Sequence, residues 1–341
     1  MENMKYEEEF ILNSRGLKLF TCRWLPFPLF SVGYGVECSI TMRGTGIRLA
    51  KAGYAVYGID YVGHGKSSGL QAYIPSFDQL VNDCSEHFTC ISGESSTPVL
   101  ASPSVAQLLT GISSSFVTEK IQYKNKMRYL LGESMGGAVA LLLHCKKPKY
   151  WDGAILVAPM CKIAEKLRPH PFVIRVLRKL SKVIPTWKIV PTQDIIDMAF
   201  KNPEKRKEIR SNPYCYKGKP RLRTAQQLLT VSLEIEKKLD QVTMPFLIVH
   251  GEADTVTDPE VSKLLYNSAS STDKTLKMYP SMWHALTSGE SPEDIEHVFS
   301  DIVAWLDERS EDRSSRSEKE RNAEHDDQFP DSQWKTIEIE G

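Results

Sequence analysis

The sequence has 341 residues, of which 41% are hydrophobic, and it carries 43 Lys and Arg against 43 Asp and Glu. A chain of this length and composition can bury a large core, which excludes a wholly disordered protein. Its formal net charge of zero excludes a general electrostatic attraction to nucleic acid or to an anionic membrane.

The seven cysteines are an odd number and include no Cys-x-x-Cys pair. This indicates reduced thiols, with neither a disulfide framework nor a zinc site. The first ten residues lack the basic and apolar regions of a signal peptide, and no apolar stretch is long enough to span a bilayer. We therefore expect a cytoplasmic location or a peripheral one at a membrane, and no cofactor or metal ion.

Short apolar runs alternate with helical patterns, which is typical of an α/β fold with a mostly parallel sheet covered by helices on both faces. The predicted strands lie at residues 54–60, 127–131, 154–158, 245–250 and 276–279. The predicted helices lie at residues 76–88, 134–145, 259–269 and 291–308. The connections carry the Gly, Asp and Pro residues expected of turns between strands and helices.

Four further segments complete the predicted organisation. Residues 164–243 contain helical patterns and prolines without a good strand run, so we expect a helical cap inserted into the core. The α/β core then comprises residues 1–163, with an atypical Ser/Thr-rich insertion at 91–126, and residues 244–308. Residues 309–341 are charged and nearly free of apolar side chains, so they cannot offset their ordering entropy and we expect disorder.

Within the cap, residues 170–187 place an apolar stripe opposite a basic side. The stripe consists of Phe172, Val173, Val176, Leu177, Leu180 and Ile184, and the basic side of Arg175, Arg178, Lys179 and Lys182. The more frequent explanation is a cap helix that packs on the domain. The alternative is a lid that contacts a membrane or lipid aggregate and admits an acyl chain.

The sequence Gly-Glu-Ser-Met-Gly at residues 132–136 matches the Gly-x-Ser-x-Gly pattern of a nucleophile elbow. It follows a predicted strand and opens a predicted helix, as such an elbow must. We expect Gly132 and Gly136 to avoid clashes in a tight turn, while Ser134 points out of the sheet edge. The simpler alternative is an ordinary turn with a helix-capping serine.

A serine nucleophile needs a histidine base and an orienting carboxylate, in the chain order Ser, Asp, His for this kind of elbow. The loop after the strand at 245–250 offers Asp254 and, as a weaker candidate, Glu252. Asp258 precedes a proline at a helix start and is therefore a predicted N-cap. His284 lies in the loop after the strand at 276–279, so we predict a triad of Ser134, Asp254 and His284.

The oxyanion of an acyl transfer needs backbone donors. The N–H of Met135, which follows the nucleophile, is the first candidate. The second is the N–H of Tyr34 in the loop "VGYGVECS", for which a glycine-rich turn without a catalytic role is the alternative.

The segments "GESMGGAVALLLH", "YGIDYVGHGKSSG", "HGEADTVTDP" and "MWHALTSGE" together resemble plant monoacylglycerol lipase-like α/β-hydrolases, a group with a serine aminopeptidase S33-type domain. The group includes caffeoylshikimate esterases and lysophospholipase-like proteins, and the resemblance covers residues 7–308. It implies an α/β-hydrolase fold with an eight-stranded sheet and a cap after the sixth strand. It also implies ester hydrolysis by Ser134, Asp254 and His284, and nothing about peptide cleavage.

The chain departs from the family pattern at "LPFPLFSVGYG", where Val32 stands in place of a histidine and Pro28 interrupts a central strand. The insertion at 91–126 also matches nothing in the family. We therefore weigh two hypotheses. The first is a serine esterase for monoacylglycerols or related acyl esters. The second is a catalytically impaired α/β-hydrolase that acts as a binding protein, because its third strand and oxyanion loop are altered. Caffeoyl ester hydrolysis, lysophospholipase, peptidase and acyltransferase activities remain further alternatives, because the same triad serves several reactions. The expected partner is a small ester or lipid, with membrane contact through the cap and no nucleic acid.

Overall fold

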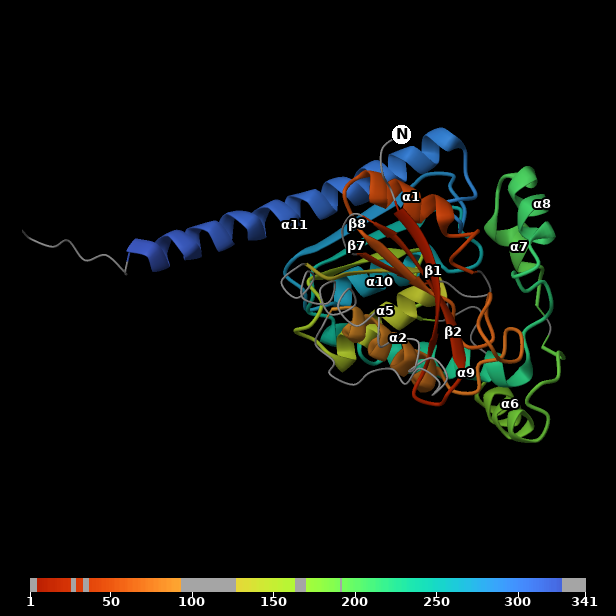
Figure 1. Cartoon of the computed structure of the whole chain (residues 1–341). Helices are drawn as coiled ribbons and strands as arrows, with labels where there is room; N and C mark the ends of the chain where they lie inside the picture. The colour runs from red at the N-terminus through yellow and green to blue at the C-terminus, as the bar shows by residue number, and fades with distance from the viewer. Residues whose placement is uncertain are drawn as a thin grey trace, which may run out of the picture. The chain divides into compact units, whose positions relative to one another are not determined.

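The computed structural model describes residues 5–25, 29–32, 37–92, 127–162, 170–190 and 192–326 (Figure 1). One sheet of eight strands has the order β1-β2-β4-β3-β5-β6-β7-β8. Strand β2 runs antiparallel to β1 and to β4, and the remaining neighbours are parallel. The strands are β1 (Lys5–Leu12), β2 (Lys18–Leu25), β3 (Leu29–Val32), β4 (Val56–Ile59), β5 (Tyr129–Glu133), β6 (Gly153–Val157), β7 (Phe246–Gly251) and β8 (Lys274–Tyr279).

Helices connect the parallel strands, as crossover geometry requires, and a helix also follows the last strand. They are α1 (Arg43–Lys51), α2 (Phe77–Ile91), α5 (Met135–Lys146), α6 (Pro171–Val183), α7 (Ile195–Ala199), α8 (Pro203–Ser211), α9 (Leu222–Glu236), α10 (Pro259–Ser268) and α11 (Pro292–Asp326), with a short 3₁₀ helix η3 (Leu239–Gln241). The architecture is that of an α/β-hydrolase, so the predicted fold class is confirmed.

The central strands are buried on both faces, because helices cover the sheet on each side. Every residue of β6 and β7 is buried. Along β2 the two faces alternate: Leu19 belongs to the core that α2, α5 and α10 share, whereas Trp24 lies against α1. A Cβ at Gly46 of α1 would lie 2.5 Å from the Trp24 ring, so a glycine allows this close approach. Figure 1 shows α1 on the opposite side of the sheet from α2 and α5.

The predicted strands agree with β4 to β8, in chain order, to within two residues at each end. The hairpin of β1 and β2 is absent from the strands read from the sequence pattern, although the family resemblance implies eight strands. Strand β3 is four residues long and pairs with β4 on one side and β5 on the other. The third strand, which the sequence suggested was altered, therefore takes its place in the sheet.

Between β6 and β7 the described residues contain helices α6 to α9 and η3 and no strand. Helix α6 packs against α9. Most of the insertion predicted at 91–126 lies outside the described residues. The boundaries of the cap and of the core segments stay predictions.

By its internal contacts the chain divides into two units, Met1–Phe299 and Ser300–Gly341. The first unit contains the complete sheet. In the second unit the backbone of α11 continues to Asp326, past the predicted start of disorder at residue 309. This segment is rich in Glu, Lys and Arg, which have high helix propensity, so a helical backbone does not require an apolar face there. Residues 327–341 lie outside the described part of the chain.

Candidate active site

Ser134 lies at the turn between β5 and α5, with φ 55° and ψ −117°. A positive φ at a residue with a side chain is strained, and such strain clusters at functional sites. The backbone is held by hydrogen bonds on both sides: the Ser134 N–H donates to the carbonyl of Val157 at 2.9 Å, and its carbonyl accepts from the N–H groups of Gly137 and Met160. Its hydroxyl makes no helix-capping hydrogen bond, which removes the simpler explanation of a capping serine.

The turn leaves no room for a side chain at Gly132. A Cβ there would lie 2.3 Å from the carbonyl oxygen of Gly136, which is backbone and cannot move aside easily. A Cβ at Gly137 would lie 2.5 Å from the Cβ of Pro159. Strand β5 and helix α5 therefore meet closely enough to hold Ser134 at the carboxyl end of the parallel strands.

Asp254 and His284 come from the loops after β7 and β8, and the structure joins them directly. His284 Nδ1 lies 2.7 Å from Asp254 Oδ2, and the side chains of both residues are buried. Glu252, the weaker candidate for the acid, is exposed. Asp258 caps α10 by accepting from the N–H of Glu260, which confirms its predicted role.

The carboxylate of Asp254 is heavily hydrogen-bonded. Its Oδ1 accepts from the backbone N–H groups of Val256 at 2.7 Å and Thr257 at 3.1 Å. Its Oδ2 lies 3.1 Å from Nε2 of His250 and 2.8 Å from Oγ1 of Thr257. Burial alone would favour the neutral carboxyl, but the hydrogen bonds with His250 and His284 hold the pKa of Asp254 well below its usual range. Asp254 is therefore an ionised acceptor at neutral pH.

Thr257 connects this pair to the end of β6. Its hydroxyl lies within hydrogen-bond distance of His284 Nδ1 (3.1 Å) and of the Ala158 carbonyl (3.1 Å) as well as of Asp254. Ala158 follows Val157, whose carbonyl accepts from Ser134. The end of β6 thus contacts both the serine turn and the acid loop.

A second connection joins the histidine loop to the serine turn. Thr287 Oγ1 donates to Glu133 Oε2 at 2.9 Å, and these residues lie close in the chain to His284 and Ser134 respectively. Burial raises the pKa of the Glu133 carboxyl, while the nearby His284 opposes that rise. The loops that carry the predicted triad therefore converge at one edge of the sheet.

In the part of the chain that the structure describes, no hydrogen bond joins the Ser134 hydroxyl to His284.

The predicted oxyanion donors are the backbone N–H groups of Met135 and Tyr34. Met135 is buried and is the first residue of α5, where N–H groups lack intrahelical acceptors and the helix dipole favours negative charge. Tyr34 lies outside the described residues.

The sequence pattern missed His250, Thr257 and the Glu133–Thr287 contact. It assigned His250 only to the end of a strand, and the one available signal was its place four residues before Asp254.

The pair of His284 and Asp254 suits acid–base chemistry, because a carboxylate that accepts from Nδ1 leaves Nε2 of His284 free to take a proton. Within the described ranges, no cluster of His, Cys, Asp and Glu could hold a metal ion, and no helix is long and apolar enough to cross a membrane.

Among curated proteins, the chain is 34% identical to caffeoylshikimate esterase of Arabidopsis thaliana over 308 residues, which cover 88% of this chain and 85% of that protein. It is 27% identical to human monoglyceride lipase over 305 residues, which cover 88% and 90% of the two chains. Among solved structures, a soluble variant of monoglyceride lipase from Saccharomyces cerevisiae, in complex with a substrate analogue, has a TM-score of 0.66 at 22% identity. That alignment covers 91% of this chain and 95% of the other and supports the fold.

A family model described as serine aminopeptidase, S33, matches residues 29–104 and 92–291. The two matched segments span most of the sheet and the region between β6 and β7. The chain therefore belongs to the serine aminopeptidase S33 family of α/β-hydrolases.

Proposed function

We propose that this protein is a serine esterase that hydrolyses carboxylic esters through an acyl-enzyme. Ser134 is the nucleophile, His284 the general base and Asp254 the carboxylate that orients the imidazole. The observation that carries the proposal is the combination of a strained serine at a strand–helix turn with a buried His284–Asp254 pair at 2.7 Å. The names of the relatives, an esterase and monoglyceride lipases, support ester chemistry.

In the first half of the reaction, Ser134 Oγ attacks the ester carbonyl while His284 Nε2 takes its proton. The tetrahedral oxyanion accepts a hydrogen bond from the Met135 N–H at the start of α5, and Tyr34 remains the predicted second donor. His284 then returns the proton to the leaving alkoxide, and the acyl-enzyme forms. Water, deprotonated by His284, attacks the acyl carbon, and His284 then returns this proton to Ser134 Oγ as the acid is released. Asp254 stays ionised throughout and stabilises the imidazolium.

For the substrate, we propose monoacylglycerols or related acyl esters. The monoglyceride lipases among the relatives support this class. Caffeoyl esters are the second candidate, supported by the caffeoylshikimate esterase at 34% identity. Lysophospholipase, peptidase and acyltransferase activities use the same triad, and no contact in the described residues favours them.

The strand pairing of the sheet does not support the hypothesis of a catalytically impaired binding protein. That hypothesis rested on an altered third strand and an altered oxyanion loop. Strand β3 is nevertheless paired on both sides, and its last residue, Val32, is opposite Gly132 of β5. Strand β3 therefore ends level with β5, at the sheet edge that carries the serine turn. Catalysis is therefore the better proposal for this chain.

The direct test is hydrolysis of a panel containing a long-chain monoacylglycerol, a lysophospholipid and a caffeoyl ester. We expect turnover of at least one ester, and Ser134→Ala should lower it by about four orders of magnitude or more, because the triad acts as a unit. Ser211→Ala, at an exposed serine of α8, is the control and should keep wild-type activity. Near-normal hydrolysis by Ser134→Ala would refute the assignment.

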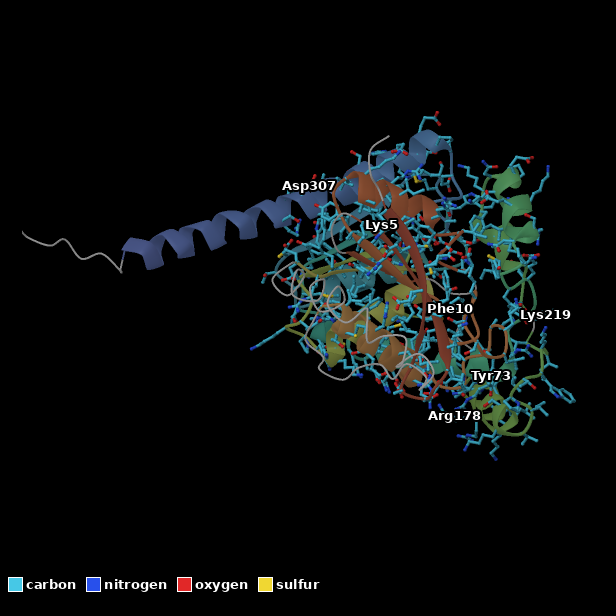
Figure 2. All side chains as sticks on the ribbon, in the orientation of Figure 1. Lys5, Phe10, Tyr73, Arg178, Lys219 and Asp307 are labelled. Carbon is cyan, nitrogen blue, oxygen red and sulfur yellow. The ribbon has the colours of Figure 1, made fainter. Side chains whose placement is uncertain are left out.

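We also propose that α6 contacts a membrane. Of the predicted apolar stripe, Leu177 and Ile184 are half-buried, and α6 packs against α9. The other four side chains of the stripe, Phe172, Val173, Val176 and Leu180, are exposed, so packing on the domain uses only part of it. Val183, Trp187 and Ile189 add further exposed apolar side chains nearby. Arg178, which Figure 2 labels beside this helix, is exposed as well. Exposed apolar groups beside basic ones suit the interface of an anionic bilayer.

Flotation with anionic liposomes tests this contact. Wild-type protein should float with the lipid, and charge reversal at Arg178 and Lys179 should weaken binding, because each basic residue near an anionic surface contributes about 1 kcal/mol. Reversal of Lys149 and Lys207, two exposed lysines outside α6, is the matched control. Absence of lipid-dependent recovery of the wild type would reject the proposal.

A further inference from the structure

His250 is a second imidazole on the proposed triad carboxylate and contacts the same carboxylate oxygen as His284. We propose that His250 is a positioning residue, held by Ser262, that fixes Asp254 for its work on His284. This inference rests on the proposed function, which it deepens. It concerns a histidine that the sequence pattern assigned only to the end of a strand.

The contact chain runs through four buried side chains. His250 belongs to β7 and Ser262 to α10, and neither has solvent-exposed surface. Ser262 Oγ lies 2.7 Å from His250 Nδ1, and His250 Nε2 lies 3.1 Å from Asp254 Oδ2. The same carboxylate oxygen lies 2.7 Å from His284 Nδ1. Asp254 Oδ2 is therefore shared between a histidine of β7 and a histidine of the loop after β8.

The partners of His250 decide which ring nitrogen carries the proton. Nε2 lies near two groups that only accept, Asp254 Oδ2 and, at 3.2 Å, the Thr257 carbonyl oxygen. Nε2 must therefore carry a hydrogen. In the neutral ring Nδ1 is then an acceptor, and the Ser262 hydroxyl donates to it. The serine thus holds His250 in the tautomer that donates to Asp254.

This donor limits how the carboxylate can turn. Backbone N–H groups of Val256 and Thr257 hold Oδ1, so the orientation of Oδ2 depends on its side-chain donors. Loss of the His250 N–H would leave the buried Oδ2 with fewer donors and let it shift from its position opposite His284 Nδ1. A misoriented carboxylate stabilises the imidazolium less, which lowers the rate of the chemical step while substrate binding stays the same.

The experiment compares three substitutions of His250 in the full chain with an activated p-nitrophenyl ester. Gln can place its amide N–H where Nε2 lies, Asn is too short to reach Asp254, and Leu has no donor. We expect His250→Leu and His250→Asn to lose roughly 10- to 100-fold in kcat with KM unchanged, as is typical when an outer-shell partner is removed. His250→Gln should stay within about threefold of wild type, because it keeps the donor.

A double-mutant cycle separates positioning from a general loss of structure. If His250 acts only through Asp254, His250→Asn should change the residual kcat by less than about twofold in an Asp254→Ala background. Each kcat is divided by the fraction of folded enzyme. That fraction is measured by thermal unfolding and by the share of Ser134 that a fluorophosphonate labels. Ser262→Ala leaves His250 in place but removes the hydroxyl that keeps its proton on Nε2. This variant should lower kcat by about three- to tenfold.

Equal kcat in His250→Asn and wild type would overturn the inference. It would also be overturned if His250→Asn lowered kcat by the same factor in the wild-type and Asp254→Ala backgrounds. Either result leaves the proposed function intact as long as Ser134→Ala is inactive. Hydrolysis by Ser134→Ala at the wild-type rate would instead remove the proposed function, so the two failures are distinguishable.

Discussion

At the scale of single residues, the serine turn is a tight backbone structure. Ser134 keeps a positive φ because Val157 of β6 holds its N–H, and Gly137 of α5 and Met160 hold its carbonyl. Gly132 makes this turn possible, since its Cα faces the Gly136 carbonyl without an intervening Cβ. The strain at Ser134 is thus sustained by backbone contacts rather than by its own side chain.

Gly132→Ala should therefore destabilise the protein. A methyl group 2.3 Å from a backbone oxygen must displace β5 or α5, and overpacking of this kind typically costs about 1–3 kcal/mol. Urea unfolding measures the change. Gly44→Ala is the control, because its Cβ in α1 would meet only the flexible end of Arg48 at 3.2 Å and alanine favours a helix. Equal stability of Gly132→Ala and wild type would contradict the described turn.

Asp60 gives a prediction on pH. Burial raises its pKa from 3.8 to about 6, despite backbone hydrogen bonds from Lys66 and Cys38 that favour the charged form. The folded state therefore holds this proton more tightly than the unfolded state, and the free energy of unfolding falls as pH rises from about 4 to 6. The stability of wild type relative to Asp60→Asn should be greater at about pH 4.5 than at about pH 7.5. If the difference in the free energy of unfolding between the two proteins did not change with pH, the raised pKa of Asp60 would be contradicted.

At the scale of elements, helices α7 and α8 are attached to loops at the candidate site. The Ala285 N–H donates to the Ala199 carbonyl at 3.0 Å, so the end of α7 holds the residue that follows His284. At the end of α8, Asn212 Nδ2 donates to Glu37 Oε1 at 3.1 Å. Glu37 is buried in the loop before α1, where hydrogen bonds from its neighbours and Asn212 keep its pKa low despite burial. This part of the region between β6 and β7 supports the site.

Two substitutions at the caps of α8 test this attachment. Asn212→Asp would keep its bond with the Tyr214 N–H but place a second carboxylate beside Glu37, and an unpaired buried charge costs roughly 3–5 kcal/mol. Asn202→Asp is the matched control, because Asn202 is an exposed N-cap and Asp caps equally well, within about 0.5 kcal/mol. Thermal unfolding of the two variants should show a large loss only for Asn212→Asp. Equal melting temperatures would refute the coupling of α8 to the loop.

Sequence patterns predicted the parallel strands well, because β5 to β7 are short, buried on both faces and bounded by turn residues. They missed β1, because this edge strand is largely solvated and carries three consecutive glutamates, which hides the alternation of a strand. The contact between Asp254 and His284 was predictable from chain order. The contacts of His250 were not, because its partners Asp254 and Ser262 meet only once β7 and α10 have packed.

At the scale of the whole molecule, the chain is electrically neutral and all seven cysteines are free thiols, as the sequence predicts. The proposed reaction uses side chains and backbone N–H groups alone. Millimolar EDTA should therefore leave kcat/KM for an ester unchanged, within about 20%. A loss of activity that added zinc or magnesium reverses would contradict the metal-independent mechanism.

The most direct measurement of the central claim is labelling by a fluorophosphonate, with the modified residue located by mass spectrometry of peptides. The account predicts one labelled residue, Ser134, and no labelling of Ser134→Ala. His284→Ala should react at least about 100-fold more slowly, because a general base contributes on this scale. Labelling at another serine, or a wild-type rate in His284→Ala, would contradict the claim that His284 activates Ser134.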